Sequence, residues 1–446
     1  MGYLATIAGG HYSTSQVQWL VDQVVTNRTP EGRAGTACGL SAIFCNLGGM
    51  SAGSMLKTVY SILSSLVLDP HPVVHFYALK SLTEIVDAAS LSYSPFVEQT
   101  LALSVRVYLA DTHEPEGGSL GSSNMRGDLP ALQLLCRLVG AIIGVLGPEL
   151  QEESRAQAMC MLLVHEFSEE EDEGMAVEAI RAVQQLLMFA PNQVDIPSLV
   201  RLFRSHITSR RLTLRLAAIT ALYQIVQRDA PLMSKLGGNR LVEDLFSLLD
   251  EDPNIDGVRE VILSWIQQTS ASSPSSWISL CQRIINQSAV SAKTVNKSSN
   301  QGFQDDEGQS LGVSDGTSMT TGSTARWRTQ LFALQCVHEI VLSVTINGRP
   351  ENFDAVLARQ NGIRSDNLLI SKVPDLIRLA FSASTATTSE VRLQGLIVLQ
   401  DVVEVCLPLQ VFRAYQTHGA SGCSALRNPL TQISKVHTSL NSIKPP

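Results

Sequence analysis

A glycine-rich segment is the first place where the residue types suggest chemistry. Gly48, Gly49 and Gly53 lie in the run Gly-Gly-Met-Ser-Ala-Gly-Ser-Met-Leu-Lys, which superficially resembles a phosphate-binding loop. Such a loop needs Gly-Lys-Ser/Thr directly before a helix, and a strand before the glycines. Here Lys57 comes four residues after Gly53, and the preceding sequence has a helical period. We therefore interpret the segment as a turn between two helices.

Acidic residues and histidines are the next candidates. The run Glu-Glu-Glu-Asp-Glu at residues 169–173 offers carboxylate oxygens to a hard cation. It lacks the alternating ligands and turn glycine of a calcium loop, so we favour a solvated loop before a helix near Met175. The nine histidines form no H-E-x-x-H motif and no zinc spacing, and there is no G-x-S-x-G elbow. The sequence therefore predicts a non-enzymatic protein with no catalytic, metal or cofactor site.

A basic cluster runs against the acidic balance of the chain. Its arginines are Arg201, Arg204, Arg210, Arg211 and Arg215. Together with His206 they fall on two successive predicted helices and the turn between them. They could form a basic ridge that contacts an acidic partner or a lipid headgroup. The alternative, which we favour, is that some of these arginines bridge helices or pair with acidic neighbours.

Composition narrows the class of protein. The chain has 446 residues, of which 44% are hydrophobic and 5% aromatic, a mixture that suits stacked helices better than a β-sandwich. Its formal net charge of −8 argues against nucleic-acid binding through phosphate neutralisation. The eight cysteines form no C-x-x-C pair, which is typical of a reducing compartment. The most apolar window, residues 132–146, falls short of the ~20 residues that span a bilayer, so we expect no transmembrane helix.

The elements that must position these residues repeat along the chain. An apolar block with helical period recurs about every 40 residues, which is typical of HEAT- or armadillo-type repeats. The first example is the set Leu40, Ile43 and Phe44, which recurs as Leu82, Ile85 and Val86. The second is the pair Val183 and Leu186, which recurs as Leu222 and Ile225 and again as Leu263 and Ile266. One helix pair cannot bury both of its faces, so neighbouring pairs must stack. The sequence predicts an all-α fold, an α–α superhelix of the HEAT/armadillo solenoid type with a disordered insert.

Composition also divides the chain into four regions. Residues 1–286 form a predicted HEAT-repeat array, and residues 326–405 form further HEAT-type helices. Between them, residues 287–325 are rich in Ser, Thr, Gly, Asn and Gln, so we expect a disordered linker. This linker could be a phosphorylated loop that regulates the protein or docks a partner. The alternative, which we favour, is an insertion that the solenoid tolerates. If deletion of the linker changed neither stability nor localisation, the second interpretation would be supported. Residues 406–446 lose the helical period, and we expect an atypical, loose tail.

Several extended stretches of the sequence resemble one known family. They lie at residues 32–58, 139–150 (Val-Gly-Ala-Ile-Ile-Gly-Val-Leu-Gly-Pro-Glu-Leu), 179–191, 326–333, 375–381 and 392–396. These stretches resemble the central part of the HEAT-repeat-containing protein 5 family, and the similarity covers most of residues 1–405. The resemblance lies in extended sequence and not in a catalytic signature, so it assigns no partner-binding residue.

The resemblance implies a function. Members of that family are much longer, all-helical cytosolic proteins that associate with the clathrin adaptor complex. The chain is then expected to be an internal portion of a scaffold for clathrin-adaptor-dependent vesicle transport between the trans-Golgi network and endosomes. The implied partners are that adaptor complex and its accessory proteins, with no cofactor and no nucleic acid. The implied location is cytoplasmic, with peripheral association at those membranes.

A generic α-solenoid scaffold in another assembly, of the nuclear transport or phosphatase type, is the alternative function. An importin-like protein would carry ladders of Trp and Asn on its inner surface. The chain has only four tryptophans, at 19, 265, 277 and 327, so the sequence does not support such a ladder.

Charge reversal tests the basic ridge. In the double variant Arg210→Glu and Arg211→Glu, a ridge that binds an acidic group would turn from attraction to repulsion. Under the interpretation that we favour, recruitment of partners and of membrane stays unchanged, as measured by co-purification and membrane fractionation. A loss of recruitment by a folded double variant would establish the ridge as a binding surface.

Overall fold

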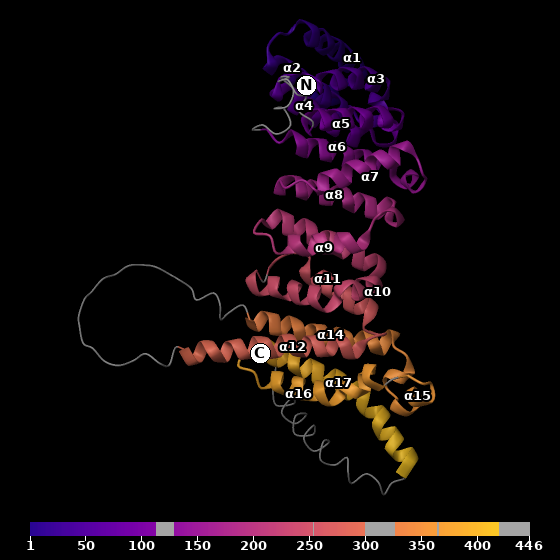
Figure 1. Cartoon of the computed structure of the whole chain (residues 1–446), viewed down its shortest axis with the longest axis vertical. Coiled ribbons are helices and arrows are strands. Elements are labelled where there is room, and N and C mark those ends of the chain that lie inside the picture. Colours follow the sequence, from indigo (N-terminus) through magenta and orange to yellow (C-terminus); the bar gives the residue numbers. More distant parts are fainter. Residues whose placement is uncertain (113–128, 253, 299–325, 364, 419–446) are drawn as a thin grey trace, which may run out of the picture. The chain divides into compact units, whose positions relative to one another are not determined.

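The computed structural model describes residues 1–112, 129–252, 254–298, 326–363 and 365–418. Every regular element among these residues is a helix (Figure 1). The chain divides into two compact units, Met1–Ile225 and Val226–Pro446, called unit 1 and unit 2 below. Within each unit, successive helices pair and the pairs stack, which confirms the predicted all-α solenoid class.

Unit 1 consists of helix pairs in two layers. Its helices are α1 (Gly2–Thr26), α2 (Pro30–Leu47), α3 (Gly49–Leu66), α4 (Pro72–Ala89), α5 (Val97–Thr112), α6 (Ala131–Leu146), α7 (Arg155–Ser168), α8 (Glu173–Phe189) and α9 (Ile196–Ile207), with short 3-10 turns η1 (Ser90–Phe96), η2 (Gly147–Gln151) and η3 (Pro191–Gln193). The pairs are α1 with α2, α3 with α4, α5 with α6, and α7 with α8. Helices α2, α4, α6 and α8 lie side by side in one layer, because each contacts the next (Figure 1).

Unit 2 repeats this arrangement. One layer contains α11 (Val258–Thr269), α14 (Arg326–Asn347) and α17 (Ser389–His418), and the other contains α12 (Pro274–Ser298) and α16 (Leu369–Ser384). Helix α12 packs against α14, and α16 packs against α17. The connection that the sequence marks as a loop before α16 holds three short helical turns, η4 (Pro350–Asn352), α15 (Ala355–Gln360) and η5 (Ser365–Asn367).

Helix α10 (Leu212–Glu251) is interrupted at Asp229, close in sequence to the boundary between unit 1 and unit 2. Asp229 leaves the helical region, with φ of −148° and ψ of 73°, and Pro231 follows it. The Asp229 carboxylate accepts a hydrogen bond of 2.9 Å from the Leu232 amide, so it caps a new helical segment. Pro231 fits the first turn of that segment because this position needs no amide donor. The sequence therefore specifies a break here.

Polar caps and prolines fix the starts of several helices. The Thr29 hydroxyl accepts a hydrogen bond of 3.2 Å from the Gly32 amide, with Pro30 in the first turn of α2. The Asp172 carboxylate accepts one of 2.8 Å from the Met175 amide at the start of α8. Each cap satisfies an amide that has no partner within the helix. The acidic run at residues 169–173 therefore leads into a helix start, as the sequence predicted.

Asp69 lies in the turn before α4. Helix α4 is capped by His71, with Pro72 in its first turn. Asp69 accepts a hydrogen bond of 2.9 Å from the His71 amide and forms a two-pronged ion pair with Arg33, at 2.8 and 3.1 Å. The paired side chains are largely buried, so this carboxylate ties the start of α2 to the turn before α4.

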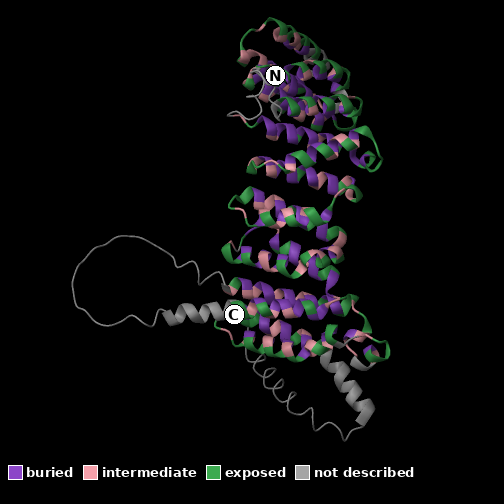
Figure 2. Ribbon diagram, viewed as in Figure 1, coloured by how far each residue is buried: buried purple, intermediate pink, exposed green. Residues whose placement is uncertain are grey.

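The apolar repeat of the sequence forms the core between the two layers of each unit (Figure 2). Buried repeat positions in unit 1 are Leu40, Ile43, Phe44, Leu82, Ile85, Val86, Val183, Leu186, Leu222 and Ile225. In unit 2 they are Ile266, Leu334, Val337, Ile340, Val341, Leu399 and Val402. Leu263, Leu396 and Val403 are only half-buried. The periodicity thus identified the buried face of each helix.

Two predicted boundaries need correction. Helix α12 continues to Ser298, into the region expected to be a disordered linker, and residues 299–325 lie outside the described residues. No Gly or Pro occurs in residues 287–298, and extending an existing helix is far easier than starting one. Helix α17 likewise continues to His418, into the expected loose tail, and residues 419–446 lie outside the described residues. Residues 113–128 also lie outside the described residues.

Two helical stretches are long and apolar enough to cross a membrane by length and composition alone, Ala131–Gln151 and Trp327–Asn347. In the structure, 61% and 56% of their most apolar windows are buried. Contacts with neighbouring helices therefore account for much of their apolar character. This explains why residues 132–146 form the most apolar window of the sequence: they belong to α6, which packs against α4, α5, α7 and α8.

Truncation of a core leucine tests the stacked core. Leu82 is fully buried, so Leu82→Ala should lower the free energy of unfolding by about 2–5 kcal/mol through lost burial and a cavity. The matched control is Leu91→Ala, because Leu91 is 76% exposed and its loss should cost about 0.5 kcal/mol or less. Urea unfolding followed by circular dichroism measures both. Equal effects of the two substitutions would contradict the assigned core.

Candidate functional site

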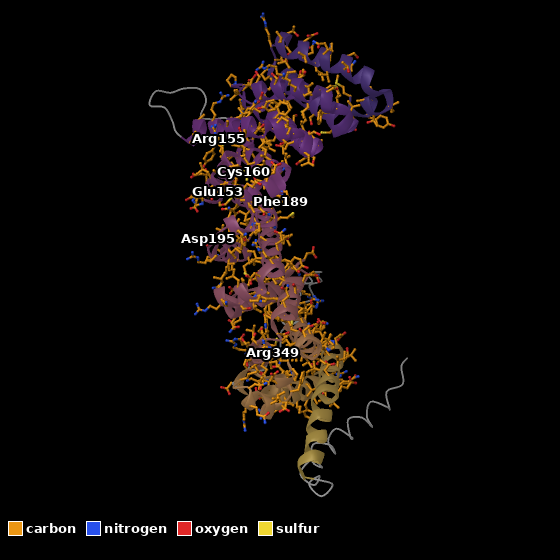
Figure 3. The ribbon with its side chains drawn as sticks, turned by 90° about the vertical axis from the view of Figure 1, so that its right-hand side faces the viewer. Glu153, Arg155, Cys160, Phe189, Asp195 and Arg349 are labelled. Atoms are coloured by element: carbon orange, nitrogen blue, oxygen red, sulfur yellow. The ribbon has the colours of Figure 1, made fainter. Side chains whose placement is uncertain are left out.

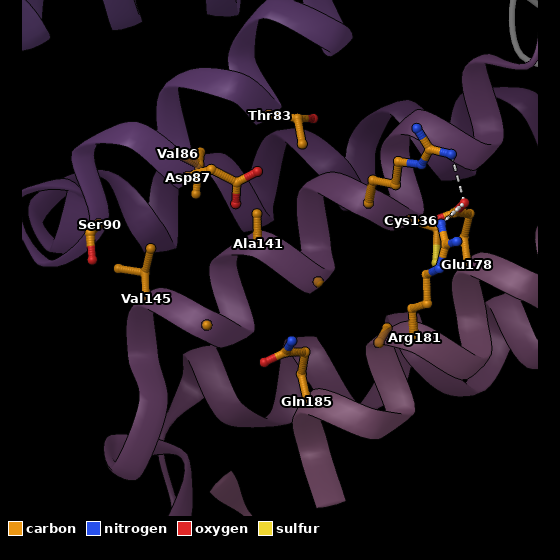
Figure 4. A pocket seen from close by; sticks show the side chains of 14 residues that line it. Thr83, Val86, Asp87, Ser90, Cys136, Ala141, Val145, Glu178, Arg181 and Gln185 are labelled. Atoms are coloured by element: carbon orange, nitrogen blue, oxygen red, sulfur yellow. Dashed lines mark hydrogen bonds and ion pairs between the residues drawn. The ribbon is translucent and has the colours of Figure 1, made fainter. Parts of the chain in front are cut away.

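A recess of about 520 Å³ lies over α6 in unit 1 (Figure 4). Small residues of α6 form its floor, namely Gly140, Ala141 and Gly144. Side chains of the two neighbouring helices form its walls, with Thr83, Asp87 and Ser90 from the α4 side and Glu178, Arg181 and Gln185 from α8. We call this hollow the α6 recess. Its volume is within the range of sites that bind ligands.

The floor of the α6 recess carries few side-chain atoms, because two of its residues are glycines. A Cβ atom built on Gly144 would meet no heavy atom within 4 Å, and one built on Gly140 would only touch Ala182 at ordinary distance. Both glycines have ordinary helical backbone angles, so neither is needed for a left-handed turn. Gly in a helix interior costs about 1 kcal/mol relative to Ala. The contacts of the described residues therefore give no packing reason for these two glycines.

A buried carboxylate holds two arginines at one edge of the recess. Glu178 is 5% exposed, and its Oε1 accepts hydrogen bonds of 2.7 Å from Arg137 and 2.8 Å from Arg181. The hydrogen bond to Glu178 raises the pKa of Arg137. The two arginine side chains are 49% and 59% exposed, so donors remain available on the solvent side. This edge has a net positive charge and a fixed geometry.

Asp87 lies across the recess from these arginines (Figure 4). Among the described residues, no side chain donates a hydrogen bond or forms an ion pair with its carboxylate. Partial burial and then the like charge of Glu84 raise the pKa of Asp87 above its ordinary value of 3.8. The charged form is thus disfavoured at this place, although it is the form present at neutral pH.

A second recess, of about 650 Å³, adjoins the first across α4 and is called the α2/α4 recess. Asp87 lines both recesses, and Cys38, Cys45, Lys80 and Glu84 line the second. Burial raises the pKa of the Cys38 and Cys45 thiols. Both are therefore thiols at neutral pH, which makes them poor nucleophiles. Together the two recesses form a surface across α2, α4, α6 and α8.

The predicted basic cluster lies on α9, on the turn after it and on the start of α10. Arg211 forms an ion pair of 3.3 Å with Glu173, and Arg201 donates a hydrogen bond of 3.0 Å to Ser198. Arg204 and Arg215 also have polar interactions, and Arg210 is exposed in the turn. The described contacts of Arg211 and Arg201 are thus with Glu173 and Ser198. Binding of an acidic partner or lipid headgroup by the cluster stays a prediction.

Charged side chains elsewhere in unit 1 project from turns. Glu153, Arg155 and Asp195 are exposed at helix starts, whereas Cys160 on α7 is buried (Figure 3). No group of three or more His, Cys, Asp or Glu that could hold a metal is present in the part of the chain that the structure describes.

Unit 2 has a hollow of about 740 Å³ between α12, α14, α16 and the start of α17. Its lining is largely apolar and includes Ile285, Leu334, Leu379, Ala383 and Val391. The side chains that follow Asn286 and Gln287 on α12 are outside the described part of the chain. On α12, the described lining of this hollow ends at Asn286.

Stacked helix pairs with a recessed surface define a HEAT-type α-solenoid, a class of scaffold whose repeats generally mediate protein–protein interaction. A family model described as the Laa1/Sip1/HEATR5 HEAT repeat region matches residues 368–406, which include α16 and the first half of α17. Over these residues the chain is similar to this family of HEAT-repeat proteins.

A plant relative and two engineered proteins complete the comparison. Protein SWEETIE of Arabidopsis thaliana is 25% identical over 421 residues, which cover 91% of this chain. The chain spans 18% of the length of SWEETIE. Crystal structures of two engineered proteins are similar at 14% and 13% identity, covering 55% and 86% of this chain and 93% and 98% of theirs. Their TM-scores of 0.36 are too low to add to the fold assignment.

Sequence reasoning did not find the α6 recess. A signal was present, because Gly140 and Gly144 lie four residues apart within the most apolar window of the chain. Glycines on the open face of a helix that otherwise favours Leu, Ile and Val are unusual, since they weaken the helix. Asp87 gave no signal, because its lack of a partner depends on how α4 and α6 pack.

Replacing Asp87 by asparagine tests its electrostatic cost. The pKa of Asp87 is raised in the folded state, so the ionised carboxylate lowers the free energy of unfolding. This loss of stability is fully present at pH values above the folded pKa. Asp87→Asn should therefore raise the melting temperature at pH 7, and the gain should shrink as the pH falls toward about 3.9, where the unfolded carboxyl is protonated. Glu153→Gln, at an exposed turn, is the control and should change little. A lower melting temperature for Asp87→Asn at pH 7 would show that the carboxylate makes a stabilising contact.

Proposed function

We propose that this chain is part of a non-enzymatic scaffold that supports clathrin-adaptor-dependent vesicle transport between the trans-Golgi network and endosomes. Its partners would be the clathrin adaptor complex and its accessory proteins. It would act in the cytoplasm, with peripheral association at those membranes. The observation that carries the scaffold part of the proposal is the recessed surface across α2, α4, α6 and α8, which offers charged and apolar contacts.

The match of residues 368–406 to the family model described as the Laa1/Sip1/HEATR5 HEAT repeat region supports the transport part of the proposal. The resemblance in residues 139–150 and 179–191 falls on α6, η2, α8 and the start of η3. These stretches include the floor of the α6 recess and the Arg181 edge. The family likeness and the candidate surface therefore overlap in the same helices.

The tryptophans argue against an importin-like scaffold. Trp265 and Trp277 are buried and pack against each other, with ring centroids 5.9 Å apart and an interplanar angle of 78°. The Trp265 indole donates a hydrogen bond of 2.9 Å to Ser234, and the Trp277 indole donates one of 2.9 Å to Thr269. These two side chains therefore serve the core of unit 2 and are not available to form a ladder for a bound peptide.

Affinity capture from cells tests the proposed function. The tagged full-length gene product should co-purify with subunits of the clathrin adaptor complex, and these subunits should be identified by mass spectrometry. A matched culture that expresses the tag alone controls for background. Absence of adaptor subunits, together with capture of nuclear-transport or phosphatase components, would favour a scaffold in another assembly and reject the proposal.

A further inference from the structure

The inference concerns the chemistry of the segment that fits the α6 recess, and it rests on the protein-binding part of the proposed function. Neighbouring helices of the unit 1 layer are joined by side-chain hydrogen bonds. Ser41 on α2 donates to Glu84 on α4, Arg137 on α6 donates to Glu178 on α8, and Gln184 on α8 donates to the Ala217 carbonyl on α10. Such bonds are the rule at the junctions of this layer.

The junction between α4 and α6 differs from the others. Among the described residues, no side-chain hydrogen bond or ion pair joins these two helices. Asp87 faces this junction, and among the described residues its carboxylate has no cationic partner; the charged group that acts on it is the acidic Glu84. An unpaired carboxylate in a partly desolvated recess is unfavourable for the free protein and favourable for binding a cation.

The opposite edge of the recess has the opposite charge. Arg137 and Arg181 share the single carboxylate of Glu178, which leaves one positive charge in excess. Because Glu178 fixes both guanidinium groups, little side-chain freedom remains to be lost when an acidic group binds there. The recess is therefore bipolar, with a negative side on α4 and a positive side on α6 and α8.

The α6 recess and the α2/α4 recess together cross α2, α4, α6 and α8, and a surface of this length suits an extended segment. An extended chain of seven residues spans about 23 Å. Neighbouring packed helices lie about 8–10 Å apart, so the three intervals from α2 to α8 add up to about 27 Å. The two lengths are similar.

We propose that the α6 recess binds an extended segment of a partner protein that places a lysine or arginine against Asp87 and an acidic side chain against Arg181. The glycine floor lets the backbone of the segment approach α6 closely. The space beside Gly144 is available for this approach, since a Cβ built there would meet no heavy atom within 4 Å. The α2/α4 recess, with Asp87 on its border, accommodates the continuation of the segment.

Peptide selection on the full 446-residue chain tests the proposal. The probe is a displayed library of random heptapeptides, and the selected peptides should be enriched in Lys or Arg together with Asp or Glu. A synthetic selected peptide should bind at least about tenfold more weakly to Asp87→Lys and to Gly144→Leu, as measured by fluorescence anisotropy. The control Glu153→Lys reverses an exposed charge outside the recess and should leave the affinity unchanged.

A charge swap separates recognition from misfolding. A peptide whose basic residue is replaced by Glu should bind Asp87→Lys more tightly than it binds the natural chain. Circular dichroism should show the same helical content for all variants, and Gly144→Leu should be at least as stable as the natural chain. Selection of no basic peptides, or equal affinity for the natural chain, Asp87→Lys and Gly144→Leu, would overturn the proposal. Failure to capture the clathrin adaptor in cells, with peptide selection intact, would reject only the transport role.

Discussion

Burial of apolar surface between neighbouring helix pairs is the constraint on which the rest of this structure depends. Each pair has apolar side chains on more than one face, so it is stable only when the next pair covers it. Leu82 and Ile85 of α4, for example, are fully buried in a layer whose neighbours are α2 and α6. The polar groups then act at the helix ends and along the open face, where they set the starts of helices and the alignment of neighbours.

Side-chain hydrogen bonds between neighbouring helices of one layer give each junction its own character. The pair Arg33 with Asp69 anchors the start of α2, whereas Glu178 gathers two arginines at the edge of α8. Apolar contacts alone are compatible with sliding of one helix along another, because they are non-directional. The directional bonds restrict this sliding. A junction without such a bond, like that between α4 and α6, is aligned by shape alone.

The sequence allowed prediction of the helices, the buried stripe and the solenoid class, since these depend on local periodicity. Its misjudgements have physical causes. Residues 287–298 contain many Ser, Thr and Asn, yet α12 continues through them because a formed helix extends easily in the absence of Gly and Pro. The pairing of Asp69 with Arg33 could not be predicted, because the two residues lie 36 positions apart in the sequence. The α6 recess depends on three helices meeting, and no local pattern encodes that Asp87 lies opposite Arg181.

Gly144 has a consequence for any effort to stabilise this protein. It lies in the last turn of α6, has no positive φ and faces open space, so replacement by a better helix former meets no steric obstacle. A screen that selects only for stability would therefore readily select variants in which Gly144 is replaced by a residue with a side chain. Each accepted side chain would fill the floor of the α6 recess while leaving the fold intact. At this residue, thermal stability and an open surface are competing properties.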